Sequence, residues 1–220
     1  MTLGRMNRVY LELGPKKVFA CSVDWPGWCR IGRSEEDALE NLMHYVPRYR
    51  VIAERAGLVF EPGDPVVVER AKGNSTTDFG APAVMPELDA EPVPLDEAAR
   101  TVAVLQAAWA VFAEVGAVSP EELRKGPRGG GRDRDKMIAH VIEAERSYAR
   151  MIGVRHKPFK LGPVKDTAAL AALRADIAEV LGRPSDGAQM SERGWSARYA
   201  ARRIAWHVID HIWEMEDRAT

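Results

Sequence analysis

The N-terminal third of the chain alternates between short apolar runs and turn-forming residues. Apolar runs over residues 9–13 and 18–23, followed by a shorter run ending at Ile31, have the length and β-branched content of strands. Gly-Pro at positions 14–15 and Trp-Pro-Gly at positions 25–27 separate these runs, and both sequences are typical of turns. The pattern therefore predicts a small antiparallel meander of three strands.

A helix is predicted directly after the third strand. Ser34 can cap its first turn, and the acidic residues at positions 35–37 favour the positive end of the helix dipole. Its apolar face consists of Ala38, Leu39, Leu42 and Val46. Pro47 should bend or interrupt this helix, and the run Pro-Val-Val-Val at positions 65–68 predicts one more strand. Residues 1–70 are thus predicted to form a small β-β-β-α-β module.

The composition changes over residues 71–94. This stretch contains many prolines and turn-forming residues and shows neither a strand period nor a helix period. Such a composition is typical of a linker. We therefore expect residues 71–94 to be an exposed connection between two separately folding units.

From residue 95 onward the apolar positions recur with the helical period of 3.6 residues. The four amphipathic segments cover about residues 96–115, 133–153, 166–182 and 196–215. Asp166 and Ser196 are candidate N-caps, and Gly116 is a candidate helix stop. Four such helices predict a four-helix bundle over residues 95–220, so the expected fold is α+β with two domains.

Composition and charge exclude several classes of protein. Hydrophobic residues make up 46% of the chain and charged residues 29%, which is typical of a globular protein. The net charge of -1 provides no field that would attract nucleic acid. No continuous apolar run reaches the roughly 18 residues of a membrane span, and the N-terminus lacks the apolar stretch of a signal peptide. We expect a cytoplasmic protein without membrane association.

The two cysteines, Cys21 and Cys29, are too few for a disulfide framework or a four-cysteine zinc site. We expect them to be buried, reduced thiols, as is usual in a reducing compartment. Neither a nucleophilic cysteine nor a nucleophilic serine is indicated, because Cys21 and Cys29 have only His44 nearby in sequence and no G-x-S-x-G motif is present.

Three histidines lie on the predicted apolar faces and indicate a metal site. His207 and His211 are four residues apart, so they share one face of the last helix, and His140 lies on the apolar face of the second bundle helix. Three neutral imidazoles leave one position of a tetrahedral ion open, as in catalytic zinc sites, and nickel or iron would also accept them. Burying three imidazoles without a partner would cost several kcal/mol, on the order of the usual polar desolvation penalty.

Two glutamates follow these histidines and are candidate catalytic residues. Glu143 comes three residues after His140, and Glu214 comes three residues after His211. They could fix imidazole tautomers or accept a proton from a bound water. A two-metal carboxylate centre is the alternative, but it requires Glu-x-x-His motifs, and here the order is reversed.

Basic residues lie close to both histidine-bearing helices. They occur at positions 124–136, around a glycine run at 129–131, and at positions 193–203. The glycine run lacks the ending of a phosphate-binding loop and is expected to be a flexible connection. Arg202 and Arg203 are candidate cofactor-binding residues that could steer the carboxylates of an anionic thiol.

Residues 90–220 resemble the DinB family of metal-binding four-helix bundles. The resemblance depends on WHVIDHIWEMEDR at positions 206–218 and MIAHVIEAERSYARMIG at positions 137–153. In that family one histidine of the second helix and an H-x-x-x-H pair of the last helix bind zinc or nickel, and these positions match His140, His207 and His211. Characterised relatives are thiol-dependent S-transferases and isomerases that use mycothiol, bacillithiol or glutathione, and metal-dependent hydrolases.

Residues 8–70 resemble the HicB antitoxin-like fold, through VFACSVDWPGWCRIGRSEEDALENL at positions 18–42. In antitoxins this module blocks a small ribonuclease and is followed by a DNA-binding segment. Here the predicted metal-binding bundle takes the place of that segment. The resemblance therefore implies a repurposed module for binding a protein partner or for homo-oligomerisation.

Together these observations predict a cytoplasmic metal-dependent enzyme that transfers or rearranges a thiol-linked small molecule. The expected cofactors are a divalent metal, zinc or nickel, and a low-molecular-weight thiol. Two alternatives stay open. One is a metal-dependent hydrolase, in which water occupies the fourth metal position. The other is a non-catalytic HicB-like binding protein with a structural metal.

Overall fold

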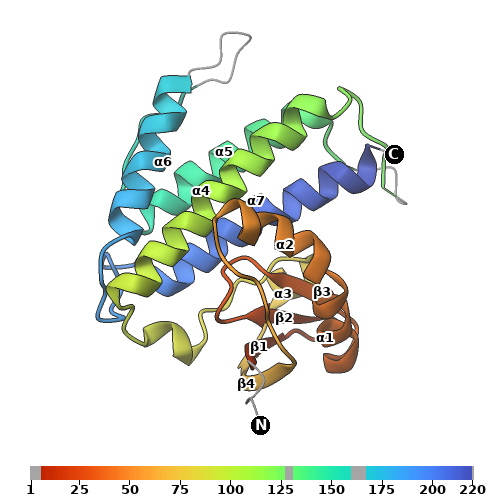
Figure 1. Ribbon diagram of the computed structural model, residues 1–220, viewed down its shortest axis with the longest axis vertical. Coiled ribbons are helices and arrows are strands. Elements are labelled where there is room, and N and C mark those ends of the chain that lie inside the picture. Colours follow the sequence, from red (N-terminus) through yellow and green to blue (C-terminus); the bar gives the residue numbers. More distant parts are fainter. Residues whose placement is uncertain (1–5, 127–130, 160–166, 220) are drawn as a thin grey trace.

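A four-stranded sheet forms the N-terminal part of the fold (Figure 1). The computed structural model describes residues 6–126, 131–159 and 167–219. The strands are β1 (Asn7–Leu13), β2 (Val18–Ser22), β3 (Cys29–Gly32) and β4 (Pro65–Lys72). Their order is β3-β2-β1-β4, with antiparallel pairing from β1 to β3 and parallel pairing between β1 and β4. The predicted meander and the later fourth strand are confirmed.

The predicted helix after β3 is present, and Pro47 marks the interruption. Helix α1 covers Glu35–His44, and the Ser34 hydroxyl accepts a hydrogen bond from the Asp37 N–H at 3.1 Å. Helix α2 covers Val46–Arg55 and has Pro47 in its first turn, where the missing N–H of proline is tolerated. The sequence pattern therefore located this break correctly.

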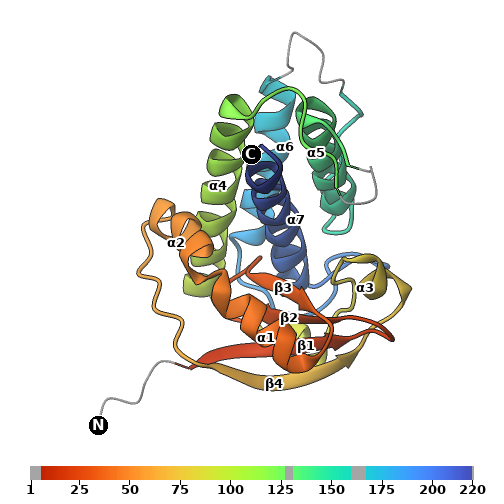
Figure 2. The same ribbon diagram turned by 90° about the vertical axis from the view of Figure 1, so that its right-hand side faces the viewer.

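Four long helices follow and pack against one another, as Figure 2 shows from the side. They are α4 (Leu95–Val118), α5 (Arg134–Arg150), α6 (Thr167–Leu181) and α7 (Ala197–Arg218). Helix α7 contacts α4 and α5, and α6 contacts the same two helices on the other side of the bundle. A four-stranded sheet followed by packed helices establishes a mixed α+β fold.

The ends of these helices test the predicted caps. The Ser196 hydroxyl accepts a hydrogen bond from the Tyr199 N–H at 3.4 Å, so Ser196 caps α7 as predicted. Gly116 does not stop α4, because the helix continues to Val118 with Gly116 buried inside it. A Cβ at position 116 would lie 3.2 Å from the Ile138 side chain, so packing against α5 accounts for this glycine. The candidate cap Asp166 lies outside the described residues.

Helix α7 lies between the sheet and the rest of the bundle and is buried along most of its length. On the sheet, Tyr10 and Phe19 face α7, and the Phe19 ring meets Trp206 edge to face with 6.3 Å between centroids. Gly27, with φ of 86°, lies so close to α7 that a Cβ there would be 2.8 Å from the Ala205 backbone. The opposite face of the sheet and the interior of the bundle belong to one continuous apolar cluster. The sheet and the bundle therefore share a core.

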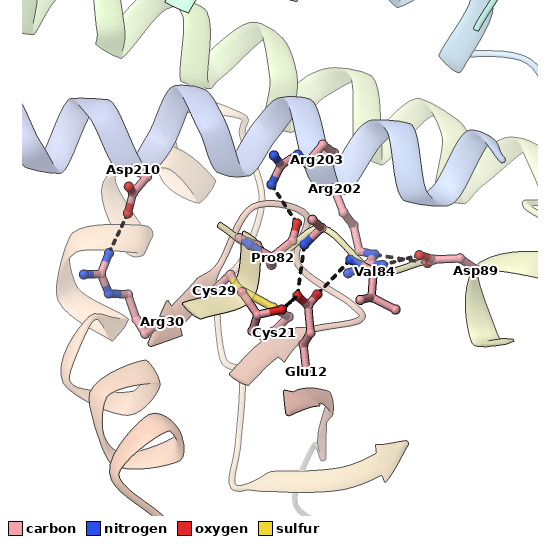
Figure 3. Close-up of a disulfide and its surroundings, with 12 residues drawn as sticks. Glu12, Cys21, Cys29, Arg30, Pro82, Val84, Asp89, Arg202, Arg203 and Asp210 are labelled. Atoms are coloured by element: carbon pink, nitrogen blue, oxygen red, sulfur yellow. Dashed lines mark hydrogen bonds and ion pairs between the residues drawn. A yellow bond between two sulfur atoms is a disulfide. The ribbon is translucent and has the colours of Figure 1, made fainter. Parts of the chain in front are cut away.

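Residues 73–94 pack against the sheet and α7. They contain α3 (Ser75–Phe79) and the 3-10 helix η1 (Glu87–Ala90). The buried carboxylate of Glu12 accepts hydrogen bonds from the Thr77 hydroxyl and from the N–H groups of Ala83 and Val84 (Figure 3). The prediction of an exposed linker is therefore wrong, because the polar residues that suggested a solvated connection bind buried partners instead.

By length and composition, helix α4 is apolar enough to cross a membrane, although the sequence contains no long uninterrupted apolar run. The same properties are found in the core helix of a globular fold. Helix α4 contacts α2, α6 and α7 and buries Leu105, Trp109 and Phe112, so in this structure it is a core helix.

Candidate metal centre

The three histidines singled out from the sequence meet between α5 and α7. One ring nitrogen from each of His140, His207 and His211 lies within 4.8 Å of the other two. The ring centroids are 5.0 Å apart for His140 and His207, 5.1 Å for His140 and His211, and 4.7 Å for His207 and His211. The four-residue step along α7 aligns its two histidines, and the packing of α5 on α7 brings the third.

Burial keeps His207 in its neutral form. Its side chain is buried, and burial together with the neighbouring His211 and His140 lowers the pKa of His207 to about 2. Partial burial, followed by the positive charge of Arg132, also lowers the pKa of His140. Neutral imidazoles have free lone pairs, which is the state that a metal ion requires.

Glu214 orients His211. The His211 Nδ1–H donates to Glu214 Oε2 at 2.8 Å, and Arg218 Nη1 donates to the other carboxylate oxygen at 2.7 Å. Burial acts to raise the pKa of Glu214, but the hydrogen bonds from His211 and Arg218 outweigh it and lower that pKa. With Nδ1 occupied in this way, Nε2 of His211 is free to act as a ligand, an arrangement found for many metal-binding histidines.

The donor set fits a divalent cation. His140 Nε2 and His207 Nε2 are 3.2 Å apart, whereas nitrogen ligands of tetrahedral zinc lie roughly 3.4 Å apart for Zn–N bonds of about 2.0–2.1 Å. His207 Nδ1 is buried and has no hydrogen-bond partner among the described residues. The two Nε2 atoms therefore lie close enough for one cation to bind both rings, with His211 as the third ligand.

Glu143, the other candidate catalytic glutamate, lies away from the histidines. Its carboxylate forms an ion pair with Arg146 one turn further along α5, and its side chain is 62% exposed. The structure therefore supports a role beside the histidines for Glu214 and not for Glu143.

Arg202 and Arg203 each have a partner within the protein. Arg202 is buried and forms an ion pair with Asp89 of η1, with its guanidinium 4.4 Å from the Tyr10 ring centroid (Figure 3). Arg203 donates to the Pro82 carbonyl at 2.6 Å and lies over the Trp206 ring. Arg202 is thus committed to holding η1 against α7 and is not available to a substrate.

The cysteines also differ from expectation. Cys21 and Cys29 are directly opposite each other on β2 and β3, and they form a disulfide beneath α7 (Figure 3). The expected free thiols are therefore wrong. The sequence could not show that the two cysteines would become cross-strand neighbours, because this depends on the register of the strands.

The remaining histidines lie outside the cluster. His44 is exposed beside Glu40, with 3.8 Å between Nε2 and the carboxylate, and His156 pairs with Asp176 at 2.7 Å. Gly129 and Gly130 of the glycine run lie outside the described residues. Nearby, Lys125 forms an ion pair with Asp133.

Glu145 is a buried charged group in the bundle that sequence reasoning missed. Glu145 is 1% exposed, accepts a hydrogen bond from the Trp109 indole, and pairs with Arg174 of α6 at 3.0 Å. Burial raises the pKa of Glu145, and both partners oppose this shift. A glutamate in the middle of an amphipathic helix resembles an ordinary exposed residue, so the sequence offered no way to find it.

No protein-family model, curated protein or solved structure matches this chain. The resemblances to the DinB family and to the HicB fold therefore stay predictions that depend on the sequence motifs. The geometry of the histidine cluster does not depend on these resemblances.

Proposed function

We propose that this protein is a DinB-like metal-dependent enzyme that transfers or rearranges a thiol-linked small molecule. The observation that carries the proposal is the cluster of His140, His207 and His211, whose nitrogens converge within 4.8 Å and whose most buried member is held neutral. Three ligands from the protein leave one position of a tetrahedral ion for a substrate, which is typical of catalytic rather than structural zinc.

The residues in and around the cluster have different roles in this proposal. His140, His207 and His211 would hold zinc or nickel, which when bound lowers the pKa of a thiol or water ligand and so supplies a nucleophile near neutral pH. Glu214 holds His211 in the tautomer that leaves Nε2 free. The Tyr148 ring packs edge-on against His207 with 5.6 Å between centroids.

The identity of the thiol and of its reaction partner stays a prediction, as do a cytoplasmic location and the use of the N-terminal module for a protein partner or for homo-oligomerisation. Because Arg202 is paired with Asp89, steering of a thiol carboxylate by this residue is not part of the proposal.

Metal content tests the proposal most directly. The purified protein should contain about one divalent ion per chain, and His207→Ala should lose it because one of three ligands is gone. His44→Ala and His156→Ala are matched controls and should retain the ion, since both side chains lie outside the cluster. Elemental analysis of the four proteins gives the answer, and wild-type metal content in His207→Ala would overturn the proposed site.

Activity distinguishes the proposed reaction from its alternatives. Metal-loaded protein should act on thiol adducts of small molecules only when a low-molecular-weight thiol is present. Turnover at full rate in thiol-free buffer would identify a hydrolase instead. Unfolding of the bundle on metal removal, with no activity toward any thiol adduct, would favour a binding protein with a structural metal.

A further inference from the structure

A cleft of about 560 Å³ opens beside the histidine cluster, between the sheet and the C-terminal end of α7. Arg30 of β3 lines one side, and Arg124 and Lys125, from the segment after α4, line another. Trp213 and Arg218 of α7 complete the wall. Small-molecule sites commonly enclose about 300–1,000 Å³, so this cleft has the size of a site for a metabolite.

The cationic groups of the cleft exceed its carboxylates. Four cationic side chains line it, together with the carboxylates of Asp210, Glu214 and Asp217. Each of these carboxylates already has a cationic partner. Asp210 pairs with Arg30 at 3.0 Å, as Figure 3 shows, Glu214 pairs with Arg218, and Asp217 pairs with Arg48, which lies outside the lining.

Arg124 is the cationic residue that an anion can reach most directly. Its side chain is exposed, and its Nη2 donates to the backbone carbonyl of Asp217 at 2.8 Å. Among the described residues no carboxylate forms an ion pair with Arg124. The neighbouring Lys125 side chain is 47% exposed and pairs with Asp133, outside the cleft lining. The two residues therefore place positive charge at the mouth of the cleft.

The cleft connects to the metal centre through one side chain. Glu214 lines the cleft and accepts the hydrogen bond from His211 at 2.8 Å. A molecule held in the cleft would therefore lie one residue away from the histidines.

We propose that this cleft binds the carboxylate end of a small organic anion, and that Arg124 and Lys125 provide the charge that recognises it. Charge-assisted hydrogen bonds from guanidinium and ammonium groups to a carboxylate are the strong polar contacts of such sites. The assignment of this molecule as the substrate rests on the proposed function, whereas the binding itself does not require the metal. This proposal also gives the N-terminal module a role in anion binding, because Arg30 of β3 lines the cleft.

Binding of succinate, used as a dicarboxylate probe, tests the inference. In nitrogen-15 NMR spectra of the full chain, succinate should shift the Gly126 amide and the Trp213 indole signals in a saturable manner, because both residues line the cleft. The double variant Arg124→Gln/Lys125→Gln should bind at least about tenfold more weakly, as expected from losing one or two charged contacts. Its fold should survive, because residue 124 is held to α7 by backbone N–H and carbonyl bonds to Arg218 that do not involve the Arg124 side chain.

Three controls make the result decisive. Lys16→Gln/Arg33→Gln removes two exposed cations of the N-terminal module outside the cleft and should leave the affinity for succinate unchanged. Succinamide, which has the shape of succinate without its charge, should not bind. Equal binding of succinamide, unchanged affinity in the Arg124/Lys125 variant, or no saturable shift would each overturn the inference. Binding of inorganic phosphate without binding of succinate would show that the carboxylate assignment is wrong.

The same titration separates this inference from the proposed function. It is performed on protein treated with a chelator and on protein loaded with zinc. Succinate binding to a chain that takes up no metal would refute the proposed function and leave the anion site standing. Metal uptake without succinate binding would refute the anion site alone.

Discussion

Arg202 and His207 are both 6% exposed on the same helix, yet their surroundings differ. Arg202 uses Nε and Nη2 to bind both carboxylate oxygens of Asp89, and its guanidinium covers the Tyr10 ring. His207 has no partner for Nδ1 among the described residues, and its Nε2 faces another imidazole nitrogen at 3.2 Å. Neutral imidazole nitrogens at this spacing are ligands that a single metal ion can bind. We infer that Arg202 stabilises the fold, whereas His207 is placed to bind a metal ion.

Loss of the Arg202 ion pair should have the largest effect on the stability of the protein. Arg202→Met should lower the free energy of unfolding by about 3–5 kcal/mol, because it leaves the Asp89 carboxylate buried without its partner. Urea denaturation monitored by circular dichroism measures this change.

The double variant Asp89→Leu/Arg202→Met is the matched control, and it should recover much of the lost stability because no charge remains buried. The metal content of the folded Arg202→Met protein should equal that of the wild type. If Arg202→Met instead lost the ion and kept its stability, the assignment of Arg202 to the fold and of His207 to metal binding would be wrong.

Metal removal should have a smaller effect on the free energy of unfolding. Free zinc at about 100 times its dissociation constant would stabilise the folded chain by about 2.7 kcal/mol, and a chelator should abolish this contribution. The chelator should leave the unfolding curve of His207→Ala unchanged, because that variant has lost a ligand. A chelator effect of equal size in both proteins would place the ion elsewhere.

Glu214 should contribute to metal affinity without being a ligand. Glu214→Gln should weaken zinc binding by about 10- to 100-fold, because the carboxylate that fixes His211 is replaced by a neutral amide. Competition with a fluorescent zinc chelator measures the affinity. Glu143→Gln, on the exposed side of α5, should bind zinc as the wild type does. Equal weakening in both variants would mean that the effect is not specific to His211.

The smallest effect concerns an exposed ion pair, the counterpart of the buried Arg202 pair. The hydrogen bond from the Lys125 side chain, followed by that from the Leu123 N–H, lowers the pKa of Asp133. A lowered folded-state pKa contributes stability above the usual carboxyl pKa, and this contribution is lost as the pH falls through the folded value. Between about pH 5 and pH 2.5 the wild type should therefore lose slightly more stability than Asp133→Asn. Urea unfolding at several pH values measures this difference. An equal loss of unfolding free energy in the two proteins across this range would contradict the prediction.

Local patterns sufficed for most of the fold. Short apolar runs bounded by turn-forming residues located the strands, Pro47 marked the break between α1 and α2, and the Ser34 and Ser196 caps were found from residue type and spacing. Each of these features depends on contacts within a few residues of the chain. The histidine cluster could also be predicted from the sequence, because His207 and His211 are four residues apart and His140 lies on an apolar helix face.

Several of the errors concern polar residues whose partners are distant in sequence. Residues 71–94 had the composition of a linker, yet Thr77 and Asp89 in this stretch are completely buried against partners in β1 and α7. The Glu145 and Arg174 pair escaped notice for the same reason, since the two residues belong to different helices.

The sequence by itself determined the four strands, the long helices and the apolar face of each of these helices, since these follow from the periods of the backbone. It did not reveal α3 and η1, whose residues were predicted to be a linker. Only the tertiary structure decided the polar pairings. Arg202 meets Asp89 across 113 residues of chain, and Cys21 meets Cys29 through the register of two strands. A residue's own neighbours in sequence cannot specify such contacts, because they depend on how complete elements pack. The same packing places α5 against α7, where His140 comes within reach of His207 and His211.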